Sequence, residues 1–216
     1  MSVAPNTPPA PQIKSARLVA TMAVAGAVAG LLIIVVFQAT LPAILAHRAA
    51  RLDAALSSVV PGLERYDTLY LLDGKLTATL PPGVDSRKTE KIYAAFDGSG
   101  RRVGFAIPTS EPGFQDAIDI LFGFDPAKPG TLGLAVLGTK ETPGLGDKIL
   151  SDGFRDQFKD AKTPVTGVKA GASQKPEDVD MITGATISSR TVIRAINKAV
   201  EKWAPLIAAY GEGGGQ

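Results

Sequence analysis

The 216-residue sequence contains no cysteine and a single histidine, His47. The absence of cysteine excludes disulfide bonds, cysteine-ligated zinc sites and iron–sulfur clusters held by this chain. His47 has no metal-ligating partner near it in the sequence and adjoins a long apolar segment. We therefore interpret it as a residue at a membrane interface rather than a metal ligand. With so few redox-capable side chains, any electron transfer by this chain requires a bound organic cofactor.

Charge is also balanced, with 23 Lys and Arg against 21 Asp and Glu and a formal net charge of +2. This balance predicts no large basic patch, so nucleic acid is not an expected partner. Charged residues are missing altogether from Leu18 to Ala46. As a helix this segment would be about 43 Å long, which exceeds the hydrocarbon core of about 30 Å. We therefore expect a transmembrane helix over residues 18–46, with a lipid bilayer as its partner.

The apolar segment leaves two questions open. A cleaved signal peptide is the alternative to a membrane anchor, although the apolar run is unusually long for one. The orientation is not signalled, because two basic residues precede the segment and two follow it: Lys14, Arg17, Arg48 and Arg51. The positive-inside rule cannot separate two charges from two.

The rest of the chain predicts tails, a second helix and one folded domain. Residues 1–17 are rich in Pro and Ala and are typical of a disordered tail. A juxtamembrane helix is expected over residues 47–64, where Pro61-Gly62 would stop it. Residues 65–206 would form the folded domain, and the Gly-rich residues 207–216 a flexible C-terminal tail.

Short apolar runs separated by turn residues predict the strands of this domain. Asp73-Gly74 and Asp97–Gly100 each lie between two such runs and indicate hairpins, and Pro108 is expected to end the second. A short helix is expected around Phe154 and Phe158. The predicted strands cover residues 69–72, 76–80, 92–96, 103–107, 117–124, 132–137 and 165–168. Antiparallel strands with segregated helices predict an α+β fold.

The stretch from Asp180 to Trp203 combines a helix entrance with an amphipathic helix. Residues 183–189 are small and rich in hydroxyl groups. A helix start offers unpaired N–H groups and the positive end of a dipole to a phosphate, although the same residues also suit an ordinary N-cap. Apolar residues then recur at helical spacing and predict one buried stripe: Val192, Ile196, Ala199 and Trp203.

A second informative loop runs from Lys140 to Lys148. Pro143-Gly144 predicts a turn, and the glycines leave room for a flat ring near the backbone. Leu145 offers this ring an apolar contact, and Thr142 with nearby backbone N–H groups can hydrogen-bond its polar edge. Loops of this composition also occur as plain connectors.

The motif Asp180-x-x-Thr183-Gly184-Ala185-Thr186 resembles the signature at which a flavin transferase joins FMN to threonine through a phosphoester. The similarity to the G subunit of the Rnf electron-transport complex covers about residues 17–206. Further motifs occur in the same order as in that subunit, namely Gly104-Phe105, Gly113–Asp116, Gly123–Pro126 and Lys140–Ile149. The C subunit of the sodium-pumping NADH:quinone reductase is a relative that shares Glu141–Gly146. The short chain length and the continuation Gly146–Ile149 look more like the Rnf protein.

This resemblance implies an FMN-binding domain over residues 65–206, with FMN attached covalently to Thr186. It implies no catalytic side chain and no metal ligand. It assigns cofactor contacts to two sets of residues, namely Asp180, Thr183, Gly184, Ala185 and Ser188 in the attachment motif, and Glu141, Thr142, Pro143, Gly144, Leu145 and Gly146 in the loop.

The Rnf family passes electrons between reduced ferredoxin and NAD, coupled to sodium or proton movement across the membrane. The resemblance therefore implies an electron-relay subunit of the inner membrane, with its FMN domain on the periplasmic side and no independent catalytic activity. Its expected partners are the other membrane and peripheral subunits of an Rnf-type complex and, during maturation, a flavin transferase.

Three alternatives stay open. The chain could act like the C subunit of the sodium-pumping reductase, as a stand-alone membrane-anchored FMN oxidoreductase, or as a non-redox anchor or assembly subunit. A steady-state assay without partners would reveal a stand-alone enzyme. A colourless protein purified from a host that contains the transferase would favour the non-redox anchor.

Overall fold

The computed structural model describes residues 15–213, and the chain divides into two compact units, residues 1–50 and 51–216. Most of the tail expected at residues 1–17 lies outside the described residues, and residues 15–17 already belong to helix α1 (Ser15–Val59). Residues 214–216 of the expected C-terminal tail also lie outside them.

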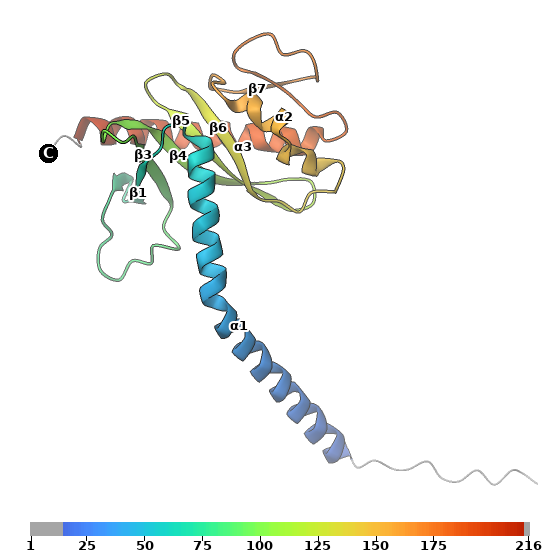
Figure 1. Cartoon of the computed structure of the whole chain (residues 1–216). Coiled ribbons are helices and arrows are strands. Elements are labelled where there is room, and N and C mark those ends of the chain that lie inside the picture. The colour runs from blue at the N-terminus through green and yellow to red at the C-terminus, as the bar shows by residue number, and fades with distance from the viewer. Residues whose placement is uncertain (1–14, 214–216) are drawn as a thin grey trace, which may run out of the picture. The chain divides into compact units, whose positions relative to one another are not determined.

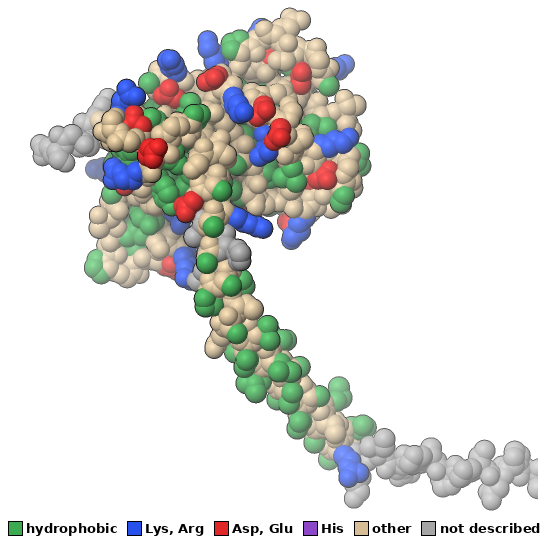
Figure 2. Space-filling view, in the orientation of Figure 1, with side chains coloured by type: hydrophobic (Ala, Val, Ile, Leu, Met, Phe, Trp, Pro, Cys, Tyr) green, Lys and Arg blue, Asp and Glu red, His purple; other side chains and the backbone are tan. Residues whose placement is uncertain are grey.

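The N-terminal part of α1 is strongly apolar. Between Ser15 and Ile44 its most apolar 18-residue window has a mean hydropathy of 2.6, and no residue of this window is buried. Apolar side chains cover the face of this segment that Figure 2 shows. Within the described residues it is the one helix that is long and apolar enough to cross a membrane, which is consistent with a single membrane anchor.

Helix α1 does not end with its apolar part. It runs without a break into the juxtamembrane helix that the sequence predicted over residues 47–64, and ends at Val59, before Pro61-Gly62, as the sequence predicted. The second unit begins at Arg51 rather than at the predicted residue 65. The physical reason is burial, because this end of α1 and the residue after it supply three fully buried core residues: Leu56, Val59 and Val60.

The second unit is built on a six-stranded antiparallel sheet in the order β2-β1-β3-β4-β5-β6 (Figure 1). Both predicted hairpins form. Asp73 and Gly74 have positive φ values of 48° and 76°, as a two-residue hairpin turn requires. The strands are β1 (Arg65–Leu72), β2 (Lys75–Thr77), β3 (Lys91–Phe96), β4 (Arg102–Pro112), β5 (Ala117–Asp125) and β6 (Gly130–Gly138).

Strand β4 is longer than the sequence predicted, because Pro108 does not end it. The register between β3 and β4 reaches from Phe96↔Arg102 to Tyr93↔Ala106, so Pro108 lies beyond it. On the other side, pairing with β5 continues through Pro108 to Pro112. A proline is tolerated in a strand where its missing N–H is not needed by a neighbouring strand.

The remaining elements are short, apart from the last helix. The predicted helix around Phe154 and Phe158 is confirmed as two single turns, and the two rings pack edge to face with centroids 5.3 Å apart. One strand, β8, was not predicted; it pairs in parallel with β7. These elements are η1 (Gly146–Leu150), α2 (Asp152–Arg155), η2 (Asp156–Phe158), β7 (Thr166–Val168), β8 (Asp178–Asp180) and α3 (Thr186–Gly213).

Helix α3 packs its predicted apolar stripe into the main core, where Val192, Ile196, Ala199 and Trp203 are all buried. It extends past residue 206, where the sequence predicted a flexible tail. That prediction was wrong because Ile207 is also buried and Tyr210 packs against the same core. The α+β architecture itself is confirmed.

Candidate functional site

The attachment motif lies at the start of α3. Gly184 has a left-handed conformation with φ of +83°, and the N–H of Ala185 donates to the carbonyl of Ile182 at 3.0 Å. Helix α3 then begins at Thr186, whose side chain is exposed. Because the first N–H groups of a helix have no partner within it, this threonine stands beside an excess of hydrogen-bond donors.

The two serines that follow are used inside the protein. Ser189 is fully buried, and its Oγ accepts the N–H of Ile182 and donates to the carbonyl of Ala185, both at 3.0 Å. Ser188 is only 2% exposed and donates its hydroxyl to another side chain. Among the hydroxyl groups of residues 183–189, those of Thr183 and Thr186 belong to exposed residues.

The partner of Ser188 is Glu141, which is 5% exposed. The Ser188 hydroxyl donates to Glu141 Oε2 at 2.5 Å. The backbone N–H groups of Phe114 and Gln115 donate to Glu141 Oε1 at 2.8 and 3.0 Å. Burial acts to raise the pKa of Glu141, but these hydrogen bonds outweigh it and hold the pKa below its usual range. The carboxyl group is therefore ionised at neutral pH.

Two glycines make room for this carboxylate. A Cβ at Gly146 would lie 2.6 Å from Glu141 Oε2 and 2.8 Å from Ser188 Oγ, and a Cβ at Gly113 would lie 2.5 Å from Glu141 Oε1. Real Cβ atoms do not approach other atoms so closely. Gly146 is thus required by the buried carboxylate, which is a different reason from the ring contact that the sequence suggested.

The turn at Pro143-Gly144 gives the loop its shape. Gly144 has a φ of +75°, and the N–H of Leu145 donates to the carbonyl of Thr142 at 3.1 Å. A second bond ties this loop to the β4–β5 turn, where Gln115 Nε2 donates to Thr142 Oγ1 at 3.0 Å. The turn projects the Leu145 side chain outward, so that it is 48% exposed.

These three segments enclose a cavity of about 310 Å³. Its walls come from the β4–β5 turn, the loop after β6 and the first turn of α3. Eight of the residues predicted to contact the cofactor line it: Glu141, Thr142, Leu145, Gly146, Gly184, Ala185, Thr186 and Ser188. The structure thus brings together two motifs that lie about 40 residues apart in the sequence.

Four predicted residues do not line this cavity. Pro143 and Gly144 form the turn beside it, and Thr183 is exposed outside it. Asp180 lies at the end of β8, where its carboxylate accepts the N–H groups of Ala172 and Ser173 at 3.2 and 3.1 Å. It therefore holds the loop before β8.

Two lining residues were not predicted as cofactor contacts, namely Phe114 and Ile187. They are large, apolar and 66% and 53% exposed. Phe114 belongs to one of the family motifs, and an aromatic residue at the exposed tip of a turn is a signal that could have identified it. Ile187 sits one position after Thr186 and lies off the buried stripe of α3.

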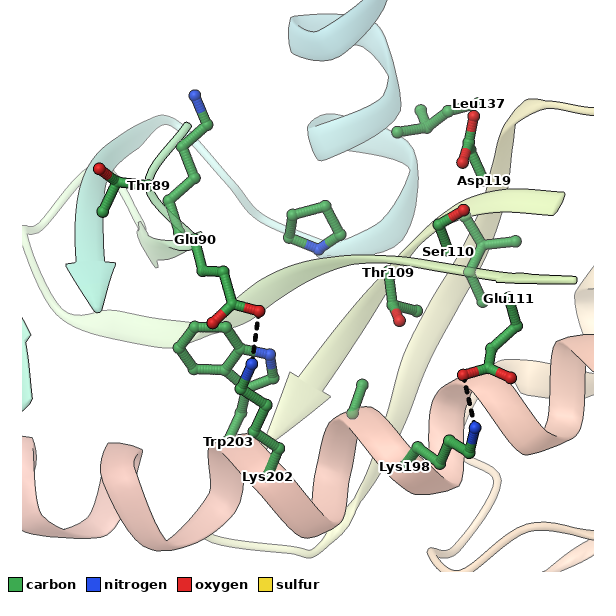
Figure 3. A pocket seen from close by; sticks show the side chains of 14 residues that line it. Thr89, Glu90, Thr109, Ser110, Glu111, Asp119, Leu137, Lys198, Lys202 and Trp203 are labelled. Carbon is green, nitrogen blue, oxygen red and sulfur yellow. Dashed lines mark hydrogen bonds and ion pairs between the residues drawn. The ribbon is translucent and has the colours of Figure 1, made fainter. Parts of the chain in front are cut away.

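A separate cavity of about 650 Å³ lies between strand β4 and helix α3 (Figure 3). Ion pairs cross it, with Lys198 Nζ 2.7 Å from Glu111 Oε1 and Lys202 Nζ 2.5 Å from Glu90 Oε1. It shares no lining residue with the cavity beside Thr186. Residues 184–188 of the attachment segment therefore line the smaller cavity and not this one.

Comparison with known proteins identifies the domain in which this cavity lies. Residues 113–201 match the family described as FMN-binding domain, and this range contains every residue that lines the smaller cavity. The fold resembles the crystal structure of Shewanella oneidensis NqrC, with a TM-score of 0.55 at 20% identity over 67% of this chain and 84% of that chain. At this identity the likeness shows a shared fold.

Relatives with closer sequences extend the match to most of the chain. The G subunit of the proton-translocating ferredoxin:NAD(+) oxidoreductase complex of Clostridium ljungdahlii is 34% identical over 111 residues, which are 51% of this chain and 58% of that protein. The G subunit of the ion-translocating oxidoreductase complex of Aliivibrio fischeri (strain MJ11) is 32% identical over 87% of this chain and 88% of its own length. At this identity and coverage, the chain belongs to the family of G subunits of ion-translocating oxidoreductase complexes.

Proposed function

We propose that this protein is the membrane-anchored flavoprotein subunit of an Rnf-type complex and relays electrons through FMN bound covalently to Thr186. One observation carries the proposal: Thr186 is exposed at the first residue of α3 and lines the cavity described above. The name of the Clostridium relative supports ferredoxin and NAD as the electron donor and acceptor of the whole complex. Bound FMN supplies the reversible uptake of electrons, for which this chain has no side chain of its own.

The start of α3 suits the phosphate of FMN. The unpaired N–H groups and the helix dipole favour an anion there by about 0.3–1 kcal/mol, or up to about 2 kcal/mol when it is partly buried. Since about 1.4 kcal/mol corresponds to a tenfold change in affinity, this interaction alone would hold the cofactor weakly. The ester bond to Thr186 would therefore be what retains FMN.

The cavity suits part of a flavin ring. Phe114, Leu145 and Ile187 are its exposed apolar residues, while Thr142 and nearby backbone groups offer hydrogen bonds. Its volume of about 310 Å³ lies at the lower end of the range of about 300–1,000 Å³ found for ligand pockets. We infer that part of the flavin would stay outside the cavity, where a partner protein of the complex could exchange electrons with it.

The geometry also favours one hydroxyl group. A flavin transferase must reach and activate the hydroxyl that attacks its donor, because an unassisted hydroxyl is a weak nucleophile. Ser188 is buried and already donates its proton to Glu141, so it is a poor substrate. Thr183 is exposed but lies outside the cavity, which leaves Thr186 as the site.

The same proposal places residues 47–216 outside the cytoplasm and residues 1–16 inside it. Its support is the family resemblance, which implies a flavin transferase that works on the extracytoplasmic side, together with the single apolar helix near the N-terminus of the described chain. A reporter that is active only in the cytoplasm, fused after Gln216, should stay silent. Strong reporter activity would reverse the assignment.

The central test uses the full-length protein, coexpressed with a flavin transferase and run on a denaturing gel. The wild-type band should fluoresce, and Thr186→Ala should abolish the fluorescence because the attachment oxygen is gone. Thr183→Ala is the matched control and should keep the signal. Thr186→Ser keeps a hydroxyl and should retain part of it. Peptide mass spectrometry that placed the FMN adduct on any other residue would refute the proposal.

A further inference from the structure

Glu141 connects all three walls of the cavity beside Thr186. It belongs to the loop after β6, its Oε1 accepts two N–H groups from the β4–β5 turn, and its Oε2 accepts the Ser188 hydroxyl from the first turn of α3. These partners lie 27, 26 and 47 residues away along the chain. This one side chain therefore hydrogen-bonds to both of the other segments, whereas the bond from Gln115 to Thr142 joins only the loop and the turn.

The charge of Glu141 is not neutralised by a cation. Among the described side chains, no Lys, Arg or His forms an ion pair with it, and the nearby Lys140 is paired with Asp116 at 2.6 Å. Its carboxylate is stabilised by one hydroxyl and two backbone dipoles. Because it is buried, solvent screens its field weakly, and it borders the cavity directly.

We propose that Glu141 is a positioning residue that fixes the three cavity walls and, by its buried negative charge, lowers the reduction potential of the bound flavin. The second part rests on the proposed function. A fixed negative charge opposes the uptake of electrons by a nearby group, so its removal raises the potential. The first part concerns the protein alone and holds with or without FMN.

Two substitutions separate geometry from charge. Glu141→Gln keeps an oxygen that accepts the N–H groups of Phe114 and Gln115, and its amide can donate to Ser188 Oγ, but the charge is lost. Glu141→Ala removes both the charge and the hydrogen-bonding groups of the side chain. Glu90→Gln is the matched control, because it causes the same change in net charge at the separate cavity of Figure 3, where Glu90 pairs with Lys202.

The geometric part is tested by amide hydrogen exchange on the full-length protein made without a transferase. Glu141→Ala should speed exchange at Phe114 and Gln115 about tenfold or more, the usual effect of losing a hydrogen bond to a charged group. Exchange in the first turn of α3 should rise with it, whereas Glu141→Gln and Glu90→Gln should stay near the wild type. Unchanged exchange in Glu141→Ala would overturn the positioning role. If Glu141→Ala does not fold, Ser188→Ala is measured instead. Faster exchange at Phe114 and Gln115 and in the first turn of α3 would then support the positioning role of Glu141, and unchanged exchange would count against it.

The electrostatic part is tested by redox titration of the flavin absorbance in the flavinylated protein. Glu141→Gln should shift the midpoint potential upward, while Glu90→Gln should leave it at the wild-type value. Equal potentials for both variants would overturn this part. A wild-type protein that carries no flavin would instead refute the proposed function, and the exchange experiment would still decide the positioning role.

Discussion

The two faces of the six-stranded sheet pack against their helices with different side chains. Towards the end of α1 the sheet presents a row of small residues on β4, β5 and β6, namely Ala106, Gly123 and Gly133, although the same face also buries Tyr93 and Leu121. Towards α3 it presents large ones, and the adjacent row is Ile107, Phe122 and Leu134. Successive residues of a strand point to opposite faces, so neighbouring rows of one sheet can differ this much.

The difference shows how each helix is held. On the α1 face the helix backbone itself approaches the sheet, since a Cβ at Gly123 would lie only 2.0 Å from the Val59 carbonyl oxygen. On the α3 face the side chains interdigitate, and Val192, Ile196 and Trp203 fill the space above the large residues. The cavity beside Thr186 lies at the end of this second face, where the first turn of α3 meets loops instead of strands.

The largest effect should come from deleting residues 51–60, which include the end of α1 that packs on the sheet. Fragment 51–213 should unfold cooperatively, whereas fragment 61–213 should not fold. Leu56, Val59 and Val60 are fully buried, and each contributes about 1.5–3 kcal/mol, which together rivals the total stability of about 5–15 kcal/mol of a typical domain. Urea denaturation followed by near-ultraviolet circular dichroism would measure this. Equal transition midpoints for the two fragments would show that the end of α1 is dispensable.

A smaller but more local effect is expected from one methyl group on the same face. Gly123→Ala should lower the free energy of unfolding by about 3 kcal/mol, because the new Cβ meets backbone that cannot move aside. Gly153→Ala is the control, since nothing lies within 4 Å of a Cβ there. Chemical denaturation of both variants gives the comparison. Equal stabilities would mean that α1 shifts without cost.

The contrast between the faces also explains what the sequence could predict. The stripe of α3 follows from its period, and the first hairpin follows from Asp73-Gly74, because both signals are local. The role of Gly123 is not local. It belongs to one of the family motifs, yet its reason is the backbone of Val59, which lies 64 residues earlier and reaches it only in the folded sheet.

The candidate site, too, could be predicted from local sequence signals only in part. The attachment motif and the loop at residues 141–146 were recognised through their resemblance to a family, but their spatial relation depends on Glu141 and Ser188, 47 residues apart. Phe114 joins them only because β4 runs on through Pro108 and carries the β4–β5 turn to the cavity. Asp180 was assigned to the cofactor by its motif, whereas its carboxylate accepts hydrogen bonds from the loop before β8.

The smallest expected effect concerns the ion pairs that cross from the sheet to α3. The hydrogen bond from Lys198 lowers the pKa of Glu111; burial raises it, and Arg194 lowers it further, so the pKa lies below its usual range. Ionised Glu111 therefore stabilises the folded state above the unfolded-state pKa of about 4.3, and this contribution disappears as the pH falls through the lower folded-state pKa.

Glu111→Gln should thus be less stable than the wild type at pH 7 by about 0.2–1 kcal/mol for each pair lost, and the difference should shrink towards pH 3. Free energies of unfolding measured across this range provide the test. Other carboxylates with lowered pKa values, such as Glu141 and Asp116, titrate in both proteins and cancel in the difference. A difference that stayed constant with pH would show that Glu111 acts through packing against α3 rather than through its charge.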